Sequence, residues 1–241
     1  MTVILEAEHL TKLYGSVTVV DDLSVSLTEG EALGVVGPNG AGKTTMLNLL
    51  TGATSADGGR IIFAGQDISH RTPDQRCHAG LGRTYQIPRP FEGMTVFENV
   101  LVGATYGRRQ SERASYELCA LALHHASLLP RANVLAGSLS LLERKRLELA
   151  RALATEPKVL LLDEIAGGLT EQEVKSLIQT IKRLRAEGIS IIWIEHIVHA
   201  LRAVVDRLVA LDFGRLIAEG DPTTVINSPE VRDVYMGSMR A

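Results

Sequence analysis

The sequence predicts an α/β fold that combines a mostly parallel sheet, an N-terminal antiparallel β-subdomain and an inserted α-helical subdomain. Short β-rich runs separated by turn signals fill residues 3–36. Strand and helix patterns alternate over residues 157–241, which favours parallel strands with helices on both faces. Residues 87–156 read as helical, so we expect a helical subdomain inserted into a core built from residues 1–86 and 157–241. All 241 residues would then form one domain.

The first half of the core begins with three β-rich runs, which we interpret as strands at residues 3–10, 16–27 and 32–36. After a glycine-rich segment, a helix is expected from Lys43 to Leu50, ending near Gly52. A further pair of strands is expected at Gly59–Phe63 and Leu81–Gln86, with a short helix from Pro73 between them.

Helical spacing dominates the inserted stretch, where we expect helices at Val96–Ala104, Arg113–His124 and Ser140–Ala154. The core then resumes with a continuous apolar strand, Val159–Leu162, of the kind that is buried on both faces of a parallel sheet. The remaining elements are a helix over 171–186, a strand at Ile189–Glu195, a helix over 197–204, a strand at Arg207–Leu211, a turn at Gly214 and a helical tail after Pro222.

Composition narrows the class of function. The formal net charge is -3, so bulk charge gives no reason to expect binding to nucleic acid or to an anionic membrane. Cys77 and Cys119 do not form a zinc or disulfide motif, which favours a reducing compartment. We find neither a leader peptide nor an apolar run of the length that a membrane span needs.

The strongest motif is G-P-N-G-A-G-K-T-T, between a predicted strand and a predicted helix. It fits the pattern G-x-x-x-x-G-K-T, in which backbone N–H groups surround a polyphosphate, the lysine reaches the terminal phosphates and the threonine hydroxyl binds magnesium. A glycine-rich turn without function would explain neither the lysine nor the helix that follows. We therefore predict an ATP and Mg²⁺ site, with nucleotide-binding residues Gly37, Pro38, Asn39, Gly40, Ala41, Gly42, Lys43, Thr44 and Thr45.

Two carboxylates follow the buried strand Val159–Leu162, at the end of a parallel strand where ligands collect. Asp163 suits a direct or indirect partner for magnesium, and Glu164 could polarise the attacking water. An Asp-Glu pair at a strand end is by itself more often a solvated loop. The preceding phosphate motif favours catalysis.

With these motifs in this order, the sequence resembles the ATPase subunits of ABC transporters along essentially its whole length. The resemblance implies a P-loop NTPase core of the RecA-like type. It also implies that Gln86 in R-T-Y-Q senses magnesium and water, that His196 in W-I-E-H contacts the γ-phosphate, and that Tyr14 stacks on adenine. Together with Lys43 and Glu164, His196 is a candidate catalytic residue, while Thr44, Gln86 and Asp163 are candidate metal ligands. For Tyr14, an aromatic side chain that fills the edge of the β-subdomain is the competing interpretation.

The main departure from the family is at its signature sequence L-S-G-G-Q, where residues 139–143 read L-S-L-L-E. In the family two chains pair head to tail, and the signature of one contacts the γ-phosphate on the P-loop of the other. Ser140 could still contact that nucleotide. Leu142 replaces a glycine, so it could hinder close approach or forbid a glycine-only dihedral, and Glu143 adds negative charge. L-S-L-L-E could also simply begin a helix.

Other departures are milder, because Ile165 stands where the family usually has proline and residues 167–170 read G-G-L-T in place of S-A-L-D. The phosphate-binding half of the site keeps Lys43, Glu164 and His196. We therefore expect this chain to hydrolyse ATP when a partner supplies a good signature, and the reciprocal site to be weaker.

Residues 83–100, together with I-E-H and the ending S-P-E-V-R-D-V-Y-M-G, look most like the ATPases of branched-chain amino acid importers. This resemblance implies a peripheral subunit on the cytoplasmic face of a bacterial inner membrane. Its partners would be two transmembrane permease subunits, a second ATPase subunit as a homo- or heterodimer, and indirectly an external substrate-binding protein. Nucleic acid is not expected as a partner.

Two alternatives stay open at this stage. A soluble ABC ATPase of DNA repair or translation would carry the same phosphate motifs, although it would generally add a coiled-coil insertion or a second ATPase domain. A nucleotide-binding regulatory subunit without activity is suggested by L-S-L-L-E and opposed by Glu164 and His196.

Overall fold

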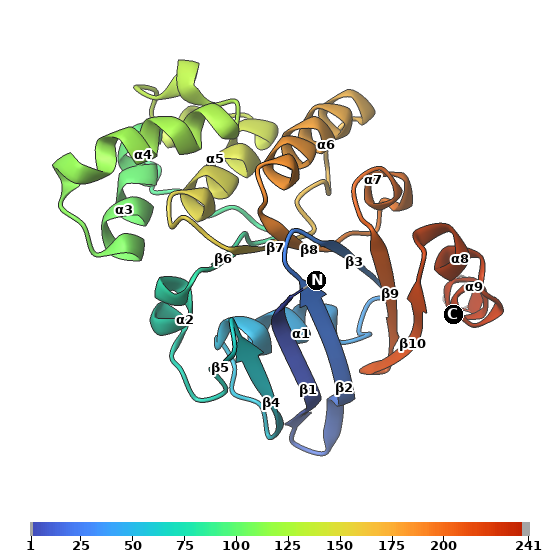
Figure 1. Cartoon of the computed structure of the whole chain (residues 1–241). Coiled ribbons are helices and arrows are strands. Elements are labelled where there is room, and N and C mark those ends of the chain that lie inside the picture. Colours follow the sequence, from blue (N-terminus) through green and yellow to red (C-terminus); the bar gives the residue numbers. More distant parts are fainter. Residues whose placement is uncertain (1, 238–241) are drawn as a thin grey trace.

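The computed structural model describes residues 2–237 and contains two β-sheets with helices packed against them (Figure 1). The larger sheet has the order β10-β9-β3-β8-β7-β6; all neighbouring strands in it run parallel except β10, which is antiparallel to β9. This arrangement confirms the predicted α/β class with a mostly parallel sheet. Its strands are β3 (Ala32–Val36), β6 (Leu81–Arg83), β7 (Val159–Asp163), β8 (Ser190–Ile194), β9 (Arg207–Asp212) and β10 (Arg215–Gly220).

The middle of this sheet is buried on both faces, as the continuous apolar runs predict. Successive side chains of a strand point to opposite faces, so Leu162 and Trp193 pack on one side while Leu161 and Ile194 pack on the other. The first side is covered by the helical region and by α6 (Glu171–Ala186), and the second by α1 (Lys43–Thr51) and the smaller sheet. Between these two cores, the carboxyl ends of β3 and β7 lie on either side of β8.

The smaller sheet is antiparallel, with the order β2-β1-β4-β5. The predicted pairing of Gly59–Phe63 with Leu81–Gln86 is wrong, because β4 pairs with β1 in this sheet and β6 pairs with β7 in the other. Leu81 and Gly82 are buried beside the fully buried β7, so burial rather than sequence proximity determines their partner. The strands are β1 (Val3–Tyr14), β2 (Val17–Thr28), β4 (Gly58–Phe63) and β5 (Gln66–Asp67).

The helices α3 (Val96–Arg108), α4 (Glu112–His125) and α5 (Leu141–Leu153) lie together at one end of the molecule (Figure 1). Each begins after a serine or threonine whose hydroxyl accepts a backbone N–H of the first turn, namely Thr95, Ser111 and Ser140. The short α2 (Pro73–Ala79) begins at the predicted proline. The sequence therefore marks these helix starts locally.

The C-terminal part contains a strand that the sequence analysis missed. Phe213 and Gly214 both have positive φ, 43° and 78°, and they turn the chain so that β10 pairs back along β9. The prediction recognised the turn at Gly214 but not the returning strand. The remaining helices are α7 (Val198–Arg202), α8 (Pro222–Asn227) and α9 (Pro229–Gly237). Among the described residues, none of the helices combines the length and apolar character that crossing a bilayer requires.

Candidate functional site

The glycine-rich segment Gly37–Thr45 connects the end of β3 to the first turn of α1. Gly42 has a φ of 95°, and a Cβ there would lie 2.6 Å from the carbonyl oxygen of Val19 in β2. Gly37 has a φ of 154°, and a Cβ there would lie 2.3 Å from the carbonyl oxygen of Leu211 in β9. Both positions require glycine, because the backbone conformation disfavours a side chain and the adjacent backbone leaves no room for one.

Helix α1 begins without any side-chain cap. Its N-cap residue is Gly42, and its first turn contains no acidic residue. The first N–H groups of a helix have no acceptor within the helix, and the helix dipole gives this end a partial positive charge. The N-terminus of α1 is therefore suited to receive an anion such as a phosphate group.

Lys43 lies at the first position of α1 and is only 6% exposed. Its Nζ donates hydrogen bonds to the carbonyl oxygens of Gly37 and Pro38, at 2.7 and 2.9 Å. Burial lowers the pKa of this lysine, while the nearby carboxylates of Glu164 and Asp163 oppose that shift. The loop carbonyls thus hold the Lys43 ammonium near the carboxylates of Asp163 and Glu164.

Glu164 follows β7 with a φ of 47°, which is uncommon for a residue other than glycine and is found at constrained sites. Gln86 Nε2 donates to Oε2 of Glu164 at 2.5 Å, and His196 Nε2 lies 2.6 Å from Oε1. An ionised carboxylate can only accept, so the histidine Nε2–H is the donor in that contact. Gln86 and His196, which are 78 and 32 positions away from Glu164 along the chain, therefore meet at one carboxylate.

These groups surround a cavity of about 270 Å³ at the N-terminus of α1. Gly37 and Pro38 do not line this cavity, but their carbonyl groups accept hydrogen bonds from Lys43, which does. His196 reaches it through its contact with Glu164. The lining residues are Val19, Asn39, Gly40, Ala41, Gly42, Lys43, Thr44, Thr45, Gln86 and Glu164, so most of the predicted nucleotide site is contiguous.

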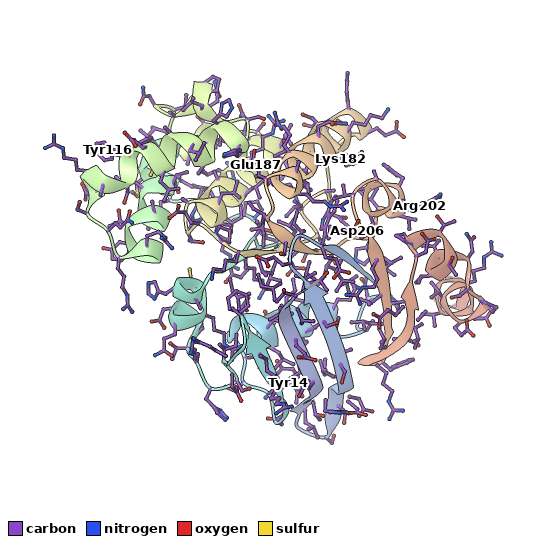
Figure 2. The ribbon with its side chains drawn as sticks, viewed as in Figure 1. Tyr14, Tyr116, Lys182, Glu187, Arg202 and Asp206 are labelled. Carbon is purple, nitrogen blue, oxygen red and sulfur yellow. The ribbon has the colours of Figure 1, made fainter. Side chains whose placement is uncertain are left out.

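Besides Gly37 and Pro38, two further predicted nucleotide-binding residues do not line this cavity. Tyr14 lies at the end of β1 in the smaller sheet (Figure 2), where its side chain is 49% exposed. The ammonium of Lys12 lies 5.6 Å from the centre of its ring. Ser140 is at the start of α5 in the helical region, where its hydroxyl accepts the backbone N–H of Glu143. Tyr14 therefore stays available at the surface, and Ser140 is oriented by its own helix.

The residue types next to the cavity suit magnesium. Asp163 is 3% exposed, and burial raises the pKa of its carboxyl group while Arg83 opposes that shift. Thr44, Gln86 and Asp163 together line an adjoining cavity of about 570 Å³ and offer hydroxyl, amide and carboxylate oxygens. Within residues 2–237 no cluster of three or more acidic, histidine or cysteine side chains forms a metal cage. Magnesium does not need one, because it is typically held by one or two protein groups together with phosphate oxygens and water.

The L-S-L-L-E segment forms the first turn of α5. Neither Leu141 nor Leu142 has a positive φ, so the suggestion that Leu142 forbids a glycine-only dihedral is wrong. The physical reason is that this position lies in ordinary helix. The suggestion that Leu142 hinders close approach stays a prediction. Leu141 lies close to the other altered segment, because a Cβ added to Gly168 would lie 3.2 Å from Leu141 Cδ2. The two departures from the family pattern therefore meet in space.

Sequence reasoning missed Arg83, which ends β6. Its side chain is 6% exposed and its Nη2 donates to Asp163 Oδ2 at 2.9 Å. The available signal was an arginine three residues before Gln86, within a run that otherwise suits a buried strand. Nothing local indicated that the strand would lie beside β7.

Comparisons with known proteins agree with this geometry. A family model described as ABC transporter matches residues 20–167, and another described as Branched-chain amino acid ATP-binding cassette transporter matches residues 215–241. The high-affinity branched-chain amino acid transport ATP-binding protein BraF of Pseudomonas aeruginosa is 34% identical and covers 97% of this chain and 98% of its own length. The lipopolysaccharide export system ATP-binding protein LptB of Haemophilus influenzae is also 34% identical, with 97% of each chain covered.

The same fold is found among solved structures. The ADP conformation of MJ1267, an ATP-binding cassette of an ABC transporter, is 31% identical and superposes with a TM-score of 0.90. The alignment covers 98% of this chain and 100% of that one. The matched family model, the full-length relatives and the shared cassette fold show that this chain belongs to the ATPase subunits of ABC transporters.

Proposed function

We propose that this chain binds ATP with Mg²⁺ at the P-loop Gly37–Thr45, hydrolyses it, and thereby drives an importer of branched-chain amino acids or similarly small polar solutes. The observation that carries the proposal is the contact of Glu164 with both Gln86 and His196 beside the buried Lys43. The names of relatives such as BraF, and the family model matched at residues 215–241, support the class of cargo.

The chemistry is hydrolysis of a phosphoanhydride bond. The N–H groups of the P-loop and the ammonium of Lys43 neutralise the phosphates, while the Glu164 carboxylate accepts a proton from the attacking water. Gln86 and His196 orient that carboxylate, and His196 can turn its Nε2–H towards the γ-phosphate. Thr44, Gln86 and Asp163 would hold the metal ion, which when bound draws electron density from the phosphate oxygens.

A second ATPase subunit completes the site in this proposal. The head-to-tail arrangement implied by the family would place Ser140 of one chain against the nucleotide on the P-loop of the other. We propose that residues 1–241 act as one ATPase domain and that residues 87–156, which include α3, α4 and α5, form its helical subdomain. Closure and reopening of the pair would convert hydrolysis into movement of the permeases.

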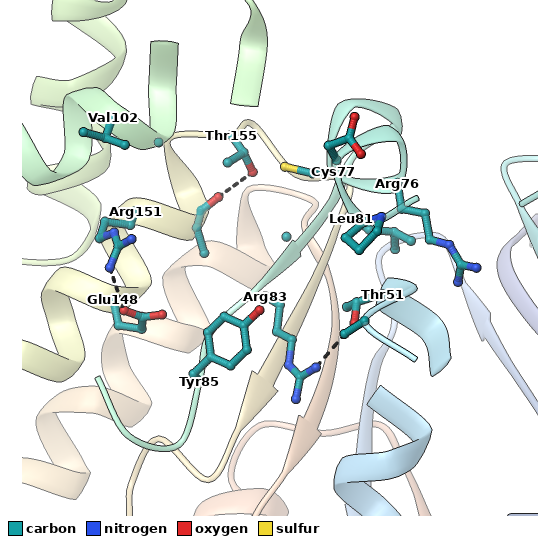
Figure 3. Close-up of a pocket in the computed structure, with 16 residues that line it drawn as sticks. Thr51, Arg76, Cys77, Leu81, Arg83, Tyr85, Val102, Glu148, Arg151 and Thr155 are labelled. Carbon is teal, nitrogen blue, oxygen red and sulfur yellow. Dashed lines mark hydrogen bonds and ion pairs between the residues drawn. The ribbon is translucent and has the colours of Figure 1, made fainter. Parts of the chain in front are cut away.

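A cavity of about 360 Å³ between α2 and β6 on one side and α3 and α5 on the other is the proposed contact site for a permease (Figure 3). Its walls combine apolar side chains such as Leu81 and Val102 with the ion pair between Glu148 and Arg151 at 3.3 Å. Such a surface suits an amphipathic segment of a membrane subunit. The chain would then sit peripherally on the cytoplasmic face of a bacterial inner membrane, with an external binding protein delivering the cargo.

The alternatives have less support. The contacts of Glu164 argue against a purely regulatory subunit, since they supply a positioned base. The full-length relatives named as transport subunits argue against a role in DNA repair or translation. Similarity to LptB leaves export of a lipid as the competing direction of transport.

The test is transport by the intact assembly. We expect the tagged chain to co-purify with permease subunits, and reconstituted vesicles to accumulate leucine when ATP and the binding protein are supplied. Glu164→Gln should lower phosphate release by about 10²- to 10⁴-fold, the range for loss of a general base, while ATP still binds. Glu171→Gln on α6 is a matched control that should leave turnover unchanged. Unaltered turnover in Glu164→Gln would remove Glu164 from catalysis, and purification without any membrane protein would reject the transport role.

A further inference from the structure

Arg83 forms a bridge between two parts of the proposed magnesium site. From the end of β6, its Nη2 donates to Asp163 Oδ2 at 2.9 Å, and its Nη1 donates to Asn48 Oδ1 at 2.6 Å and to Thr51 Oγ1 at 3.3 Å. The side chains of Arg83 and Asp163 are 6% and 4% exposed. One planar guanidinium group therefore joins the end of β7 to α1 in a buried environment.

The bridge reaches α1 one turn after a candidate metal ligand. Thr44 and Asn48 are four residues apart in this helix, so their side chains lie on the same face. Asn48, Thr44 and Asp163 also line the same cavity of about 570 Å³. Arg83 thus constrains the separation of Thr44 and Asp163, because one of its terminal nitrogens binds α1 and the other binds Asp163.

Arg83 also lines the groove proposed for the permease. Its guanidinium carbon lies 4.8 Å from the centre of the Tyr85 ring, and both residues line the groove cavity (Figure 3). Arg83 Nε is buried and has no hydrogen-bond partner among the described residues. The guanidinium therefore lies where the two cavities adjoin, with Nη2 bound to Asp163 and Nη1 bound to Asn48 and Thr51 of α1.

We propose that Arg83 is a positioning residue that sets the distance and orientation of Asp163 relative to Thr44 for magnesium. This inference rests on the proposed ATP and Mg²⁺ site. It depends on geometry more than on charge, because a lysine at this position would supply a single nitrogen and could not hold β7 and α1 at the separation that the two nitrogens of a guanidinium set. A bidentate donor of fixed shape is what the two ends of the bridge require.

The test separates metal-dependent from metal-free nucleotide binding. A fluorescent ATP analogue is titrated onto the purified chain in EDTA and over a range of Mg²⁺ concentrations. Arg83→Met and Asn48→Ala should each raise the Mg²⁺ concentration for half-maximal enhancement of binding by about tenfold, and their double variant should show no further loss because both remove one bridge. Binding in EDTA should match the wild type in all variants. Arg83→Lys should resemble Arg83→Met.

Arg89→Met provides the matched control, because Arg89 lines the same cavity of about 570 Å³ and, among the described residues, its side chain makes no hydrogen bond or ion pair with Asp163. It should leave the Mg²⁺ dependence unchanged. Full recovery by Arg83→Lys would overturn the geometric role, as would an equal loss of binding in EDTA or additive losses in the double variant. Failure of the wild-type chain to bind nucleotide in either condition would instead reject the proposed function. Asn48→Ala removes a half-exposed side chain, so it keeps the test decisive if Arg83→Met does not fold.

Discussion

The N-termini of α1 and α5 present the same backbone N–H groups but differ in whether a side chain caps them. Helix α1 begins after Gly42, with no side-chain cap and no acid in its first turn. Helix α5 begins after Ser140 with a complete capping box, in which the Glu143 carboxylate accepts the Ser140 N–H at 2.9 Å and the Ser140 hydroxyl accepts the Glu143 N–H at 3.4 Å. The N-terminus of α1 can therefore receive an anion from outside, whereas the N-terminus of α5 already binds the carboxylate of Glu143.

The difference lies in the side chains, since both ends present a row of N–H donors with a partial positive charge. Glu143 is further held by Arg131, whose Nε lies 2.9 Å from Oε1. A phosphate arriving at α5 on a partner's nucleotide would meet this carboxylate, whereas a phosphate arriving at α1 meets Lys43. The backbone N–H groups of Ser140 and Glu143 are therefore already bonded within the capping box and are less available to a phosphate group than those at the start of α1.

The largest expected effect comes from closing the open end of α1. Gly42→Ala would place a Cβ 2.6 Å from the Val19 carbonyl oxygen at a φ of 95°, so the loop must shift. Strain of this kind costs about 1–3 kcal/mol, which lowers Tm by several degrees. Nucleotide affinity should fall by about tenfold or more, measured by titration with a fluorescent ATP analogue.

Gly40→Ala is the control for that substitution. Gly40 also has positive φ, 85°, but a Cβ there would meet nothing within 4 Å, so only backbone strain remains. Its losses of affinity and Tm should be smaller than those of Gly42→Ala. Equal losses would show that the close approach of β2 to the loop is unimportant.

Much of the open half-site follows from local sequence. The glycines, Lys43 and the helix after them are adjacent in the chain, and Glu164 follows a run of apolar residues that is typical of a buried strand. Local patterns therefore predict both sides of the phosphate cavity. Whether Tyr14 stacks on adenine stays a prediction.

Other features depended on contacts between distant segments. The position of β6 beside β7 brings Arg83 to Asp163 across 80 residues, and no periodicity in either strand encodes that pairing. The strand β10 was missed because its half-buried pattern follows from the hairpin with β9. For Leu142, the possibility of a glycine-only dihedral was wrong because the backbone there is helical.

A smaller effect is expected from removing the charge at the capped end. Glu143→Gln keeps a side-chain oxygen for the capping box but removes the negative charge that a partner's nucleotide would meet. In an assembly whose second subunit has an intact P-loop, turnover at that P-loop should rise about two- to fivefold, matching about 0.3–1 kcal/mol for a charge at a helix terminus. Phosphate release measured under single turnover would report it.

The α6 helix supplies a matched control, because Thr170 and Glu173 form the same capping box at its start. Glu173→Gln should leave turnover unchanged. If Glu143→Gln reduces turnover instead, the Glu143 carboxylate assists hydrolysis at the partner's P-loop. That result would contradict the idea that the capped start of α5 is unfavourable to a phosphate group.

The smallest effect is the pH dependence of the capped end. The hydrogen bond from the Ser140 backbone N–H lowers the pKa of Glu143, with burial opposing the shift and Arg131 adding to it. A carboxyl group whose folded pKa is lowered contributes stability above its unfolded value near 4.5, and this contribution is lost as pH falls through the folded pKa. The Tm advantage of the wild type over Glu143→Gln should therefore be present at pH 6 and shrink as the pH falls below about 4.5. Helix α1 has no acid in its first turn, so its open end adds no such titration. A Tm difference that stays constant across this range would mean that the Glu143 carboxylate does not hold the start of α5.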